Sequence, residues 1–241
     1  MIKIKFFVKE LTEQISIIQD FLKRKNNLSN YIAKCFDIDI NLPKQKRDKE
    51  IKEKITKLYY EKFEEMKNSC AKFQSAWDNS ATFINEELIN IFGKEFFFEC
   101  KGFINLNPIF PRYLETKSFD IHTDCDDEEM LFSSTHEIIH FVWFEIWKEN
   151  FPNTLPIECE FPNLIWFISE LAIEPIFRFS NLKELSSCNP AYDYFYTDKL
   201  GNKTLAETAN EIFASSKNIN DFQIKIYNAF KDNEEIYKLI K

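Results

Sequence analysis

The stretch SSTHEIIHFVWF, residues 133–144, contains two of the three histidines in the chain. His136 and His140 are four positions apart, and Glu137 directly follows the first of them. On a helix, side chains four apart lie on one face, so both imidazoles can reach the same ion. Glu137 lies about 100° around the helix axis, beside that ion. The stretch therefore predicts a buried helix with a zinc site and a carboxylate that can deprotonate a water.

A catalytic zinc ion generally has three protein ligands, so a third residue is needed. The segment FPNLIWFISELAIEPIF, residues 161–177, is mainly apolar and predicts a second helix, which should stop near the proline at 175. Burying its glutamates is costly unless they are paired or bound to metal, so Glu170 is the predicted third ligand. Glu174, one turn later, could accept the second ring N–H of a metal-bound histidine, or form an ion pair with Arg178.

Other residues compete for the position of third ligand. No histidine follows His140, so a downstream histidine is excluded. His122 lies upstream on a predicted strand, and Glu158 and Glu160 precede the second helix. The sequence alone leaves these alternatives open beside Glu170.

The rest of the chain is predicted to be mostly helical. Only three glycines occur, which removes the residue most often used in tight hairpins. Apolar residues recur at helical spacing in several segments, whereas residues 95–122 show apolar runs broken by glycine and proline. We expect helices at 8–25, 28–37, 44–77, from 78 or 80 to near Gly93, and from 124 to 148, with strands at 96–106 and 117–122. The predicted class is α+β, predominantly helical, with a small β-sheet before the histidine-bearing helix.

The predicted organisation is an N-terminal helical region, residues 1–93, followed by a catalytic domain, residues 94–241. A single continuous domain is the alternative. At 241 residues the chain can form either arrangement.

Composition excludes several classes of protein. With 44% hydrophobic and 16% aromatic residues the chain should fold rather than stay disordered. A net charge of -8 argues against a nucleic-acid surface. No apolar stretch reaches the roughly 20 residues needed to span a bilayer, and the N-terminus does not have the pattern of a signal peptide. The six cysteines are scattered singly, which favours reduced thiols and a cytoplasmic location.

The HEIIH motif at residues 136–140, followed by SELAIE on a second helix, resembles the gluzincin branch of zinc metallopeptidases, the thermolysin-like group. The resemblance covers the two motif helices. It implies a zincin-like domain, a zinc cofactor and a peptide or protein substrate. It also implies that zinc polarises the scissile carbonyl while Glu137 takes a proton from water and delivers it to the leaving amine.

Two features of the resemblance concern further site residues. A tyrosine, histidine or arginine commonly stabilises the oxyanion in such enzymes, and the segment NPAYDYFYTDK supplies three candidate tyrosines, of which Tyr194 is the predicted one. Tyr192 and Tyr196 are the others. Arg112 is a weaker candidate for binding a substrate carboxylate, and a structural ion pair is the preferred alternative for it. The spacing typical of the group would select Glu160 as third ligand, whereas Glu170 requires a longer connection.

Two other classes of function compete with a peptidase. One is a regulatory or binding protein on a zincin scaffold, with the metal in a structural role. Glu137 argues against it, because a structural site has no need of a base beside it. The other is a metal-free helical interaction module that uses the helix at 44–77. The sequence does not define the cleavage specificity or the oligomeric state.

Overall fold

The computed structural model describes residues 1–24, 26–185, 190–233 and 236. These residues form a mostly helical structure with a small β-sheet, which confirms the predicted α+β class. The chain forms two compact units. The sheet unit comprises Lys3–Asn79 and Glu99–Ser134, and the helical unit comprises Met1–Ile2, Ser80–Phe98 and Thr135–Lys241. Both units combine separate stretches of the chain, and the division predicted between residues 93 and 94 stays a prediction.

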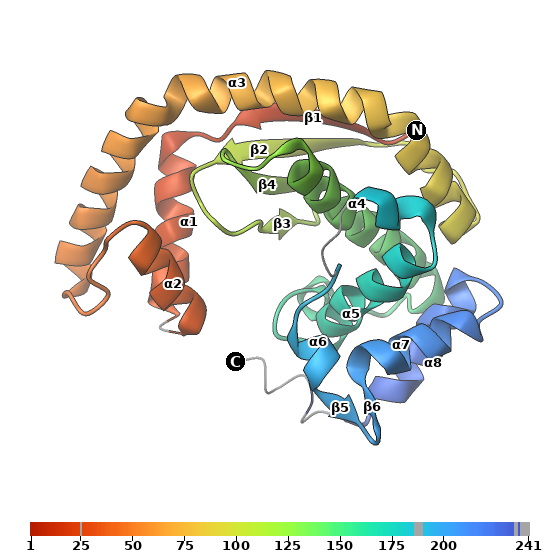
Figure 1. Ribbon diagram of the computed structural model, residues 1–241. Helices are drawn as coiled ribbons and strands as arrows, with labels where there is room; N and C mark the ends of the chain where they lie inside the picture. The colour runs from red at the N-terminus through yellow and green to blue at the C-terminus, as the bar shows by residue number, and fades with distance from the viewer. Residues whose placement is uncertain (25, 186–189, 234–235, 237–241) are drawn as a thin grey trace. The chain divides into compact units, whose positions relative to one another are not determined.

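The sheet unit contains a four-stranded sheet, visible in Figure 1. The strands are β1 (Lys3–Val8), β2 (Glu99–Asn105), β3 (Arg112–Tyr113) and β4 (Ser118–His122), in the order β1-β2-β4-β3. Strands β1, β2 and β4 are mutually parallel, and β3 pairs antiparallel with β4. The strands predicted at 96–106 and 117–122 are confirmed as β2 and β4, while β1 and β3 were not predicted.

Strand β1 corrects the prediction for the N-terminus, where a helix was expected to begin at residue 8. In KIKFFV the buried residues Ile4 and Phe6 alternate with exposed Lys3 and Lys5, which is the period of a strand. The helix α1 spans Leu11–Lys23. Helix α2, Asn27–Cys35, follows after a capping box formed by Asn26 and Ser29, close to the predicted position.

Gly102 allows β1 and β2 to pack closely. It pairs with Phe6 in the parallel register. A Cβ atom at Gly102 would lie 2.5 Å from Cδ1 of the Phe6 ring, closer than two carbon atoms can approach. Phe6 also packs edge-on against Phe73 at 6.1 Å between ring centroids. The missing side chain of Gly102 thus provides the space for a core aromatic ring.

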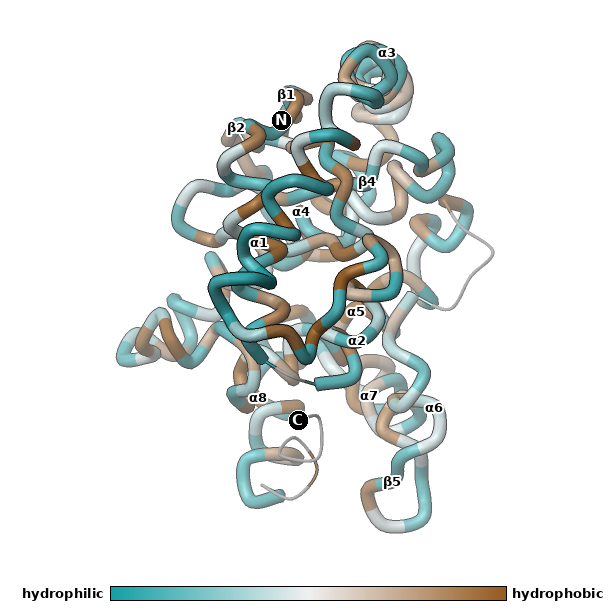
Figure 2. The backbone as a smooth tube through the Cα atoms, turned by 90° about the vertical axis from the view of Figure 1, so that its left-hand side faces the viewer, coloured by the Kyte–Doolittle hydropathy of each residue, from teal (hydrophilic) through white to brown (hydrophobic). Residues whose placement is uncertain are grey.

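Helix α3 is a single helix of 49 residues, Lys44–Phe92, where two helices were predicted. The predicted break at residue 78 or 80 is wrong, because the buried positions continue through it with Trp77, Ile84 and Leu88. In the sheet unit the helix buries a stripe at helical spacing, formed by Ile51, Ile55, Tyr59, Met66 and Phe73. In Figure 2, hydrophilic and more hydrophobic stretches alternate around α3, as this stripe requires.

The helical unit is built around α5 (Leu164–Arg178), every residue of which from Ile165 to Phe177 is buried. Helix α4 (Asp127–Asn150) enters this unit at Thr135. The other elements are η1 (Pro156–Cys159), η2 (Asn181–Leu185), α6 (Tyr194–Thr197), β5 (Lys199–Leu200), β6 (Lys203–Thr204), α7 (Leu205–Ala214) and α8 (Ile219–Phe230). Both motif helices are thus confirmed as helices, although α5 continues three residues past Pro175, the predicted stop.

Aromatic contacts hold the helices of this unit together. Phe167 of α5 packs edge-on against Phe195 of α6 at 5.4 Å and against Phe230 of α8 at 5.7 Å between ring centroids. Trp143 of α4 contacts Phe222 of α8 at 5.7 Å. Rings of this size bury much apolar area, so these contacts fix the helices that carry the candidate site.

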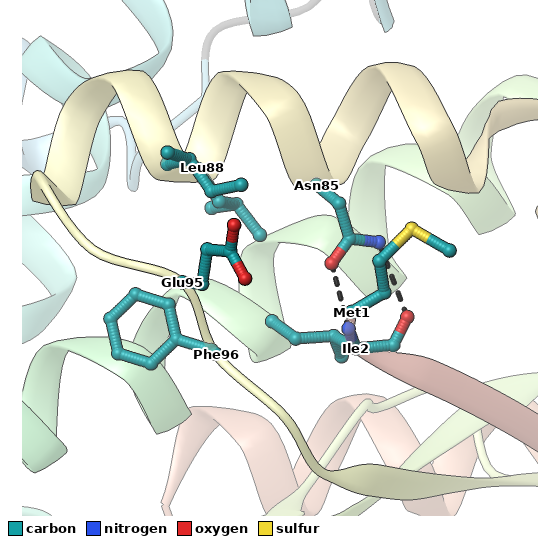
Figure 3. Close-up of a pocket in the computed structure, with 7 residues that line it drawn as sticks. Met1, Ile2, Asn85, Leu88, Glu95 and Phe96 are labelled. Carbon is teal, nitrogen blue, oxygen red and sulfur yellow. Dashed lines mark hydrogen bonds between the residues drawn. The ribbon is translucent and has the colours of Figure 1, made fainter.

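The first two residues of the chain belong to the helical unit. The side chain of Asn85 accepts a hydrogen bond from the backbone N–H of Ile2 at 2.7 Å and donates one to its carbonyl at 3.2 Å. Figure 3 shows both bonds beside a cavity of about 90 Å³ lined in part by Leu88, Glu95 and Phe96. The side-chain amide of Asn85 therefore satisfies both backbone polar groups of Ile2 and attaches the N-terminus to the C-terminal part of α3.

Among the described residues, none of the helices combines the length and the apolar character that crossing a membrane requires.

Candidate metal centre

Helix α4 directs two imidazole rings to one point. His136 and His140 lie one turn apart, and their Nε2 atoms are 3.0 Å from each other. The His140 side chain is fully buried, while that of His136 is 17% exposed. Solvent therefore reaches the pair from the side of His136.

Glu170 brings a carboxylate from α5 to the same point. Its Oε2 atom lies 3.4 Å from Nε2 of His136 and 3.4 Å from Nε2 of His140, and its side chain is only 3% exposed. Two imidazole nitrogens and one carboxylate oxygen therefore form a compact triangle inside the helical unit. We call His136, His140 and Glu170 the metal group.

The metal group fits a tetrahedral zinc ion. With metal–ligand bonds of about 2.0–2.1 Å, two ligand atoms of a tetrahedral ion lie about 3.3 Å apart. The three separations in the group, 3.0, 3.4 and 3.4 Å, are close to that value. Two histidines and one glutamate also form a donor set used by catalytic zinc sites, which keep a fourth position for water or substrate.

Glu137 follows His136 on α4 and is buried, with 6% of its surface exposed. As the neighbour of His136 in the helix, it lies about 100° around the axis from that ligand. The carboxylate predicted to act as a base is therefore held inside the unit, next to a residue of the metal group.

Tyr194, the predicted oxyanion stabiliser, is the first residue of α6. Its hydroxyl oxygen is buried and has no hydrogen-bond partner among the described residues. Burial raises the pKa of Tyr194, and the nearby Tyr192 and the carboxylate of Glu170 raise it further. The buried hydroxyl is thus available to hydrogen-bond a ligand.

Glu174 is fully buried one turn after Glu170. Its carboxylate accepts hydrogen bonds from Nε of Arg178, from the hydroxyl of Tyr196 at 2.5 Å, and from Nδ2 of Asn210 at 3.2 Å. Among the described residues its partners include no histidine ring, so the predicted contact with a ligand histidine is not seen. The alternative, an i,i+4 ion pair with Arg178, is present.

The competing third ligands are not part of the metal group, as far as the described residues show. Glu158 accepts a hydrogen bond from the backbone N–H of Leu155 at 2.7 Å and caps η1, and Glu160 is half-buried after η1. His122 ends β4 in the sheet unit, where its Nδ1 atom accepts from the N–H of Asp124 at 3.2 Å. Arg112 is on β3 in the sheet unit as well.

Sequence reasoning missed the roles of Tyr196 and Asn210 as partners of Glu174. Tyr196 was considered only for the oxyanion, and Asn210 follows Glu174 by 36 residues on a helix whose docking no local pattern reveals. A buried glutamate predicts that some donor is near, but it does not say which one.

Comparisons with known proteins give no relative for this chain. No family model matches it, and neither a curated protein nor a solved structure matches it. The inference of function therefore depends on the geometry of the metal group and its neighbours.

Proposed function

We propose that this protein is a zinc-dependent metallopeptidase whose zinc ligands are His136, His140 and Glu170. The observation that carries the proposal is the convergence of three ligand atoms from two helices at 3.0 to 3.4 Å from one another. A zincin-like, gluzincin-type domain is part of the same proposal, since the metal group and the helices α4 and α5 agree with the resemblance of the motif. The substrate class is peptide or protein.

Zinc bound by this group would polarise the carbonyl of a peptide bond and lower the pKa of a water. Glu137 takes the proton from that water as general base and then gives it to the leaving amine. Its buried position on α4, directly after the proposed ligand His136, supports this role. The same carboxylate would have no task in a site where metal serves stability alone.

The Tyr194 hydroxyl donates a hydrogen bond to the oxygen that becomes negatively charged as water adds to the carbonyl. Its buried position, without a hydrogen-bond partner among the described residues, supports this role. A donor held in place before reaction needs no reorganisation when the charge develops. Burial also raises the pKa of Tyr194, so the hydroxyl keeps its proton at neutral pH.

A cytoplasmic location is the accompanying proposal. Cys35, Cys70 and Cys125 are free thiols in the structure, which supports a reducing compartment. Cys188 lies outside the described residues.

Metal content tests the proposal. Untagged protein, purified without chelator, is analysed by mass spectrometry beside the His136→Ala and Glu170→Ala variants, and each preparation is incubated with a mixture of internally quenched peptides. We expect about one zinc per chain and peptide cleavage in the wild type, with both lost in the two variants. Glu149→Gln is the matched control, because this carboxylate lies on α4 but is exposed and paired with Lys94.

Zinc lost with His136 but retained in Glu170→Ala would contradict the assignment of the third ligand. Wild-type protein that binds no zinc after reloading and cleaves no peptide would contradict the function itself.

A further inference from the structure

Helix α6 has only four residues, so its position must be fixed by contacts with other elements. A helix this short is unstable alone, because nucleation costs more than one turn returns. Two of its side chains supply such contacts. Phe195 is fully buried against Phe167 of α5, and the Tyr196 hydroxyl bonds Glu174 of the same helix.

The bond between Tyr196 and Glu174 joins elements at a fully buried carboxylate. Arg178 lies on the same helix as Glu174, while Tyr196 comes from α6 and Asn210 from α7. A buried carboxylate is tolerated only where donors replace its lost hydration, and hydrogen bonds to a charged acceptor are the strong ones. Glu174 thus ties α6 and α7 to the helix that carries Glu170.

Helix α6 carries two tyrosines, Tyr194 and Tyr196, and α5 carries two glutamates. Glu170 and Glu174 are one turn apart, about 6 Å along the helix axis. Tyr196 bonds the second glutamate, and Tyr194 on the same short helix has a buried hydroxyl with no hydrogen-bond partner among the described residues. Movement of Tyr196 away from Glu174 would therefore also displace the Tyr194 hydroxyl, because both residues belong to the same turn of helix.

We propose that Tyr196 and Glu174 are positioning residues, whose hydrogen bond fixes helix α6 and so places the Tyr194 hydroxyl beside the metal group. This inference rests on the proposed peptidase function, since it assigns the bond a part in that reaction. The inference also explains why Glu174, which is not a proposed zinc ligand, is fully buried. Neither residue touches the reacting atoms.

The test removes the hydroxyl of Tyr196 and keeps its ring. Tyr196→Phe is compared with Tyr227→Phe, a half-buried tyrosine of α8 whose ring packs against Trp147 and Phe151. In Tyr196→Phe we expect the zinc content and KM of the wild type, with kcat at least about tenfold lower, since a hydrogen bond to a charged group is being lost. Amide hydrogen exchange over residues 194–198 should become faster. The Tyr227→Phe control should match the wild type in all of these measurements.

A double-mutant cycle separates positioning from general destabilisation. If Tyr196 acts through Tyr194, adding Tyr196→Phe to Tyr194→Phe causes no further loss of kcat, whereas independent effects would multiply. Glu174→Gln, which keeps an acceptor oxygen for Tyr196, should retain more activity than Glu174→Ala.

The outcomes distinguish this inference from the function on which it rests. Wild-type kcat in Tyr196→Phe, or multiplying effects in the double variant, would overturn the inference while an active, zinc-loaded wild type leaves the peptidase intact. Wild-type protein without zinc or activity would overturn the peptidase, and the positioning role with it.

Discussion

The Nε2 atoms of His136 and His140 lie only 3.0 Å apart, although Cβ atoms one helical turn apart are separated by about 5–6 Å. Both rings are therefore turned toward one point, where Oε2 of Glu170 lies 3.4 Å from each of them. The three polar atoms thus lie close enough together to be ligands of one ion. The convergence makes metal removal and site substitution informative about stability as well as activity.

Removing zinc should destabilise the folded protein. A ligand present at about 1,000 times its dissociation constant adds about 4 kcal/mol to the free energy of unfolding, which for a chain of this size is about 10 °C in melting temperature. Scanning calorimetry with and without a chelator measures this shift. The melting temperature of His140→Ala should not respond to the chelator, and an equal response in that variant would contradict the ligand assignment.

Glu137→Gln should separate metal binding from catalysis. The amide keeps the size of the side chain but cannot accept a proton, so kcat should fall by about 10²–10⁴-fold while zinc content stays at the wild-type level. Steady-state kinetics with quenched peptides and metal analysis on the same preparation check both parts. Activity equal to that of the wild type would rule out the mechanism, including the role of the carboxylate as base.

Tyr194→Phe should lower kcat with little effect on zinc content or KM. Its hydroxyl is expected to bond the substrate oxygen only as negative charge develops, and removal of one such donor typically costs about 10²–10³-fold. Single-turnover cleavage of a quenched peptide isolates this step. The matched comparison is Tyr60→Phe, a 70% exposed tyrosine of α3, which should behave as wild type.

Gly102→Ala should destabilise the sheet unit. The added Cβ would lie 2.5 Å from a carbon of the Phe6 ring, and overpacking of a core costs about 1–3 kcal/mol. Urea unfolding measures the free energy of unfolding. Shortening the opposing side chain with Phe6→Leu makes space, so Gly102→Ala should cost less in that background. Equal costs in both backgrounds would show that the ring does not set the constraint.

Asp120 should make the stability of the sheet unit depend on pH. It is fully buried, with Lys9 donating to Oδ1 at 2.6 Å and Asn105 to Oδ2 at 2.7 Å. Burial raises the pKa of its carboxyl from 3.8 to about 6, against the opposing effect of Lys9. Because the folded pKa is the higher one, the folded state binds the proton more tightly, and stability contributed by Asp120 is lost as pH rises from about 4 through about 6.

Unfolding of metal-free protein in urea at pH 4.5 and pH 7, compared with Asp120→Asn, isolates this contribution. The difference in pKa corresponds to at most about 3 kcal/mol. The variant should be less sensitive to pH than the wild type in this window, and an identical pH dependence would show that Asp120 does not titrate there.

The sequence by itself determined the helices that carry the site and the residues that can bind metal. The mainly apolar segment at residues 161–177 predicted α5, and the region from residue 124 to 148 predicted α4, because apolar composition and helix start and stop signals are local to the chain. The spacing of His136 and His140 is likewise fixed by one turn of helix, so their convergence on one point could be predicted without a fold. Strands β2 and β4 were recognisable as well, from apolar runs interrupted by glycine and proline.

Only the tertiary structure decided which distant residues meet. Glu170, rather than Glu158 or Glu160, lies beside the histidines because of the way α5 packs in the helical unit, and no local pattern contains that information. The pairing of β1 with β2 joins residues almost 100 positions apart. Glu174 bonds Tyr196 and Asn210 for the same reason, since the partner of a buried carboxylate is chosen by long-range packing, whereas its need for a partner follows from its own charge.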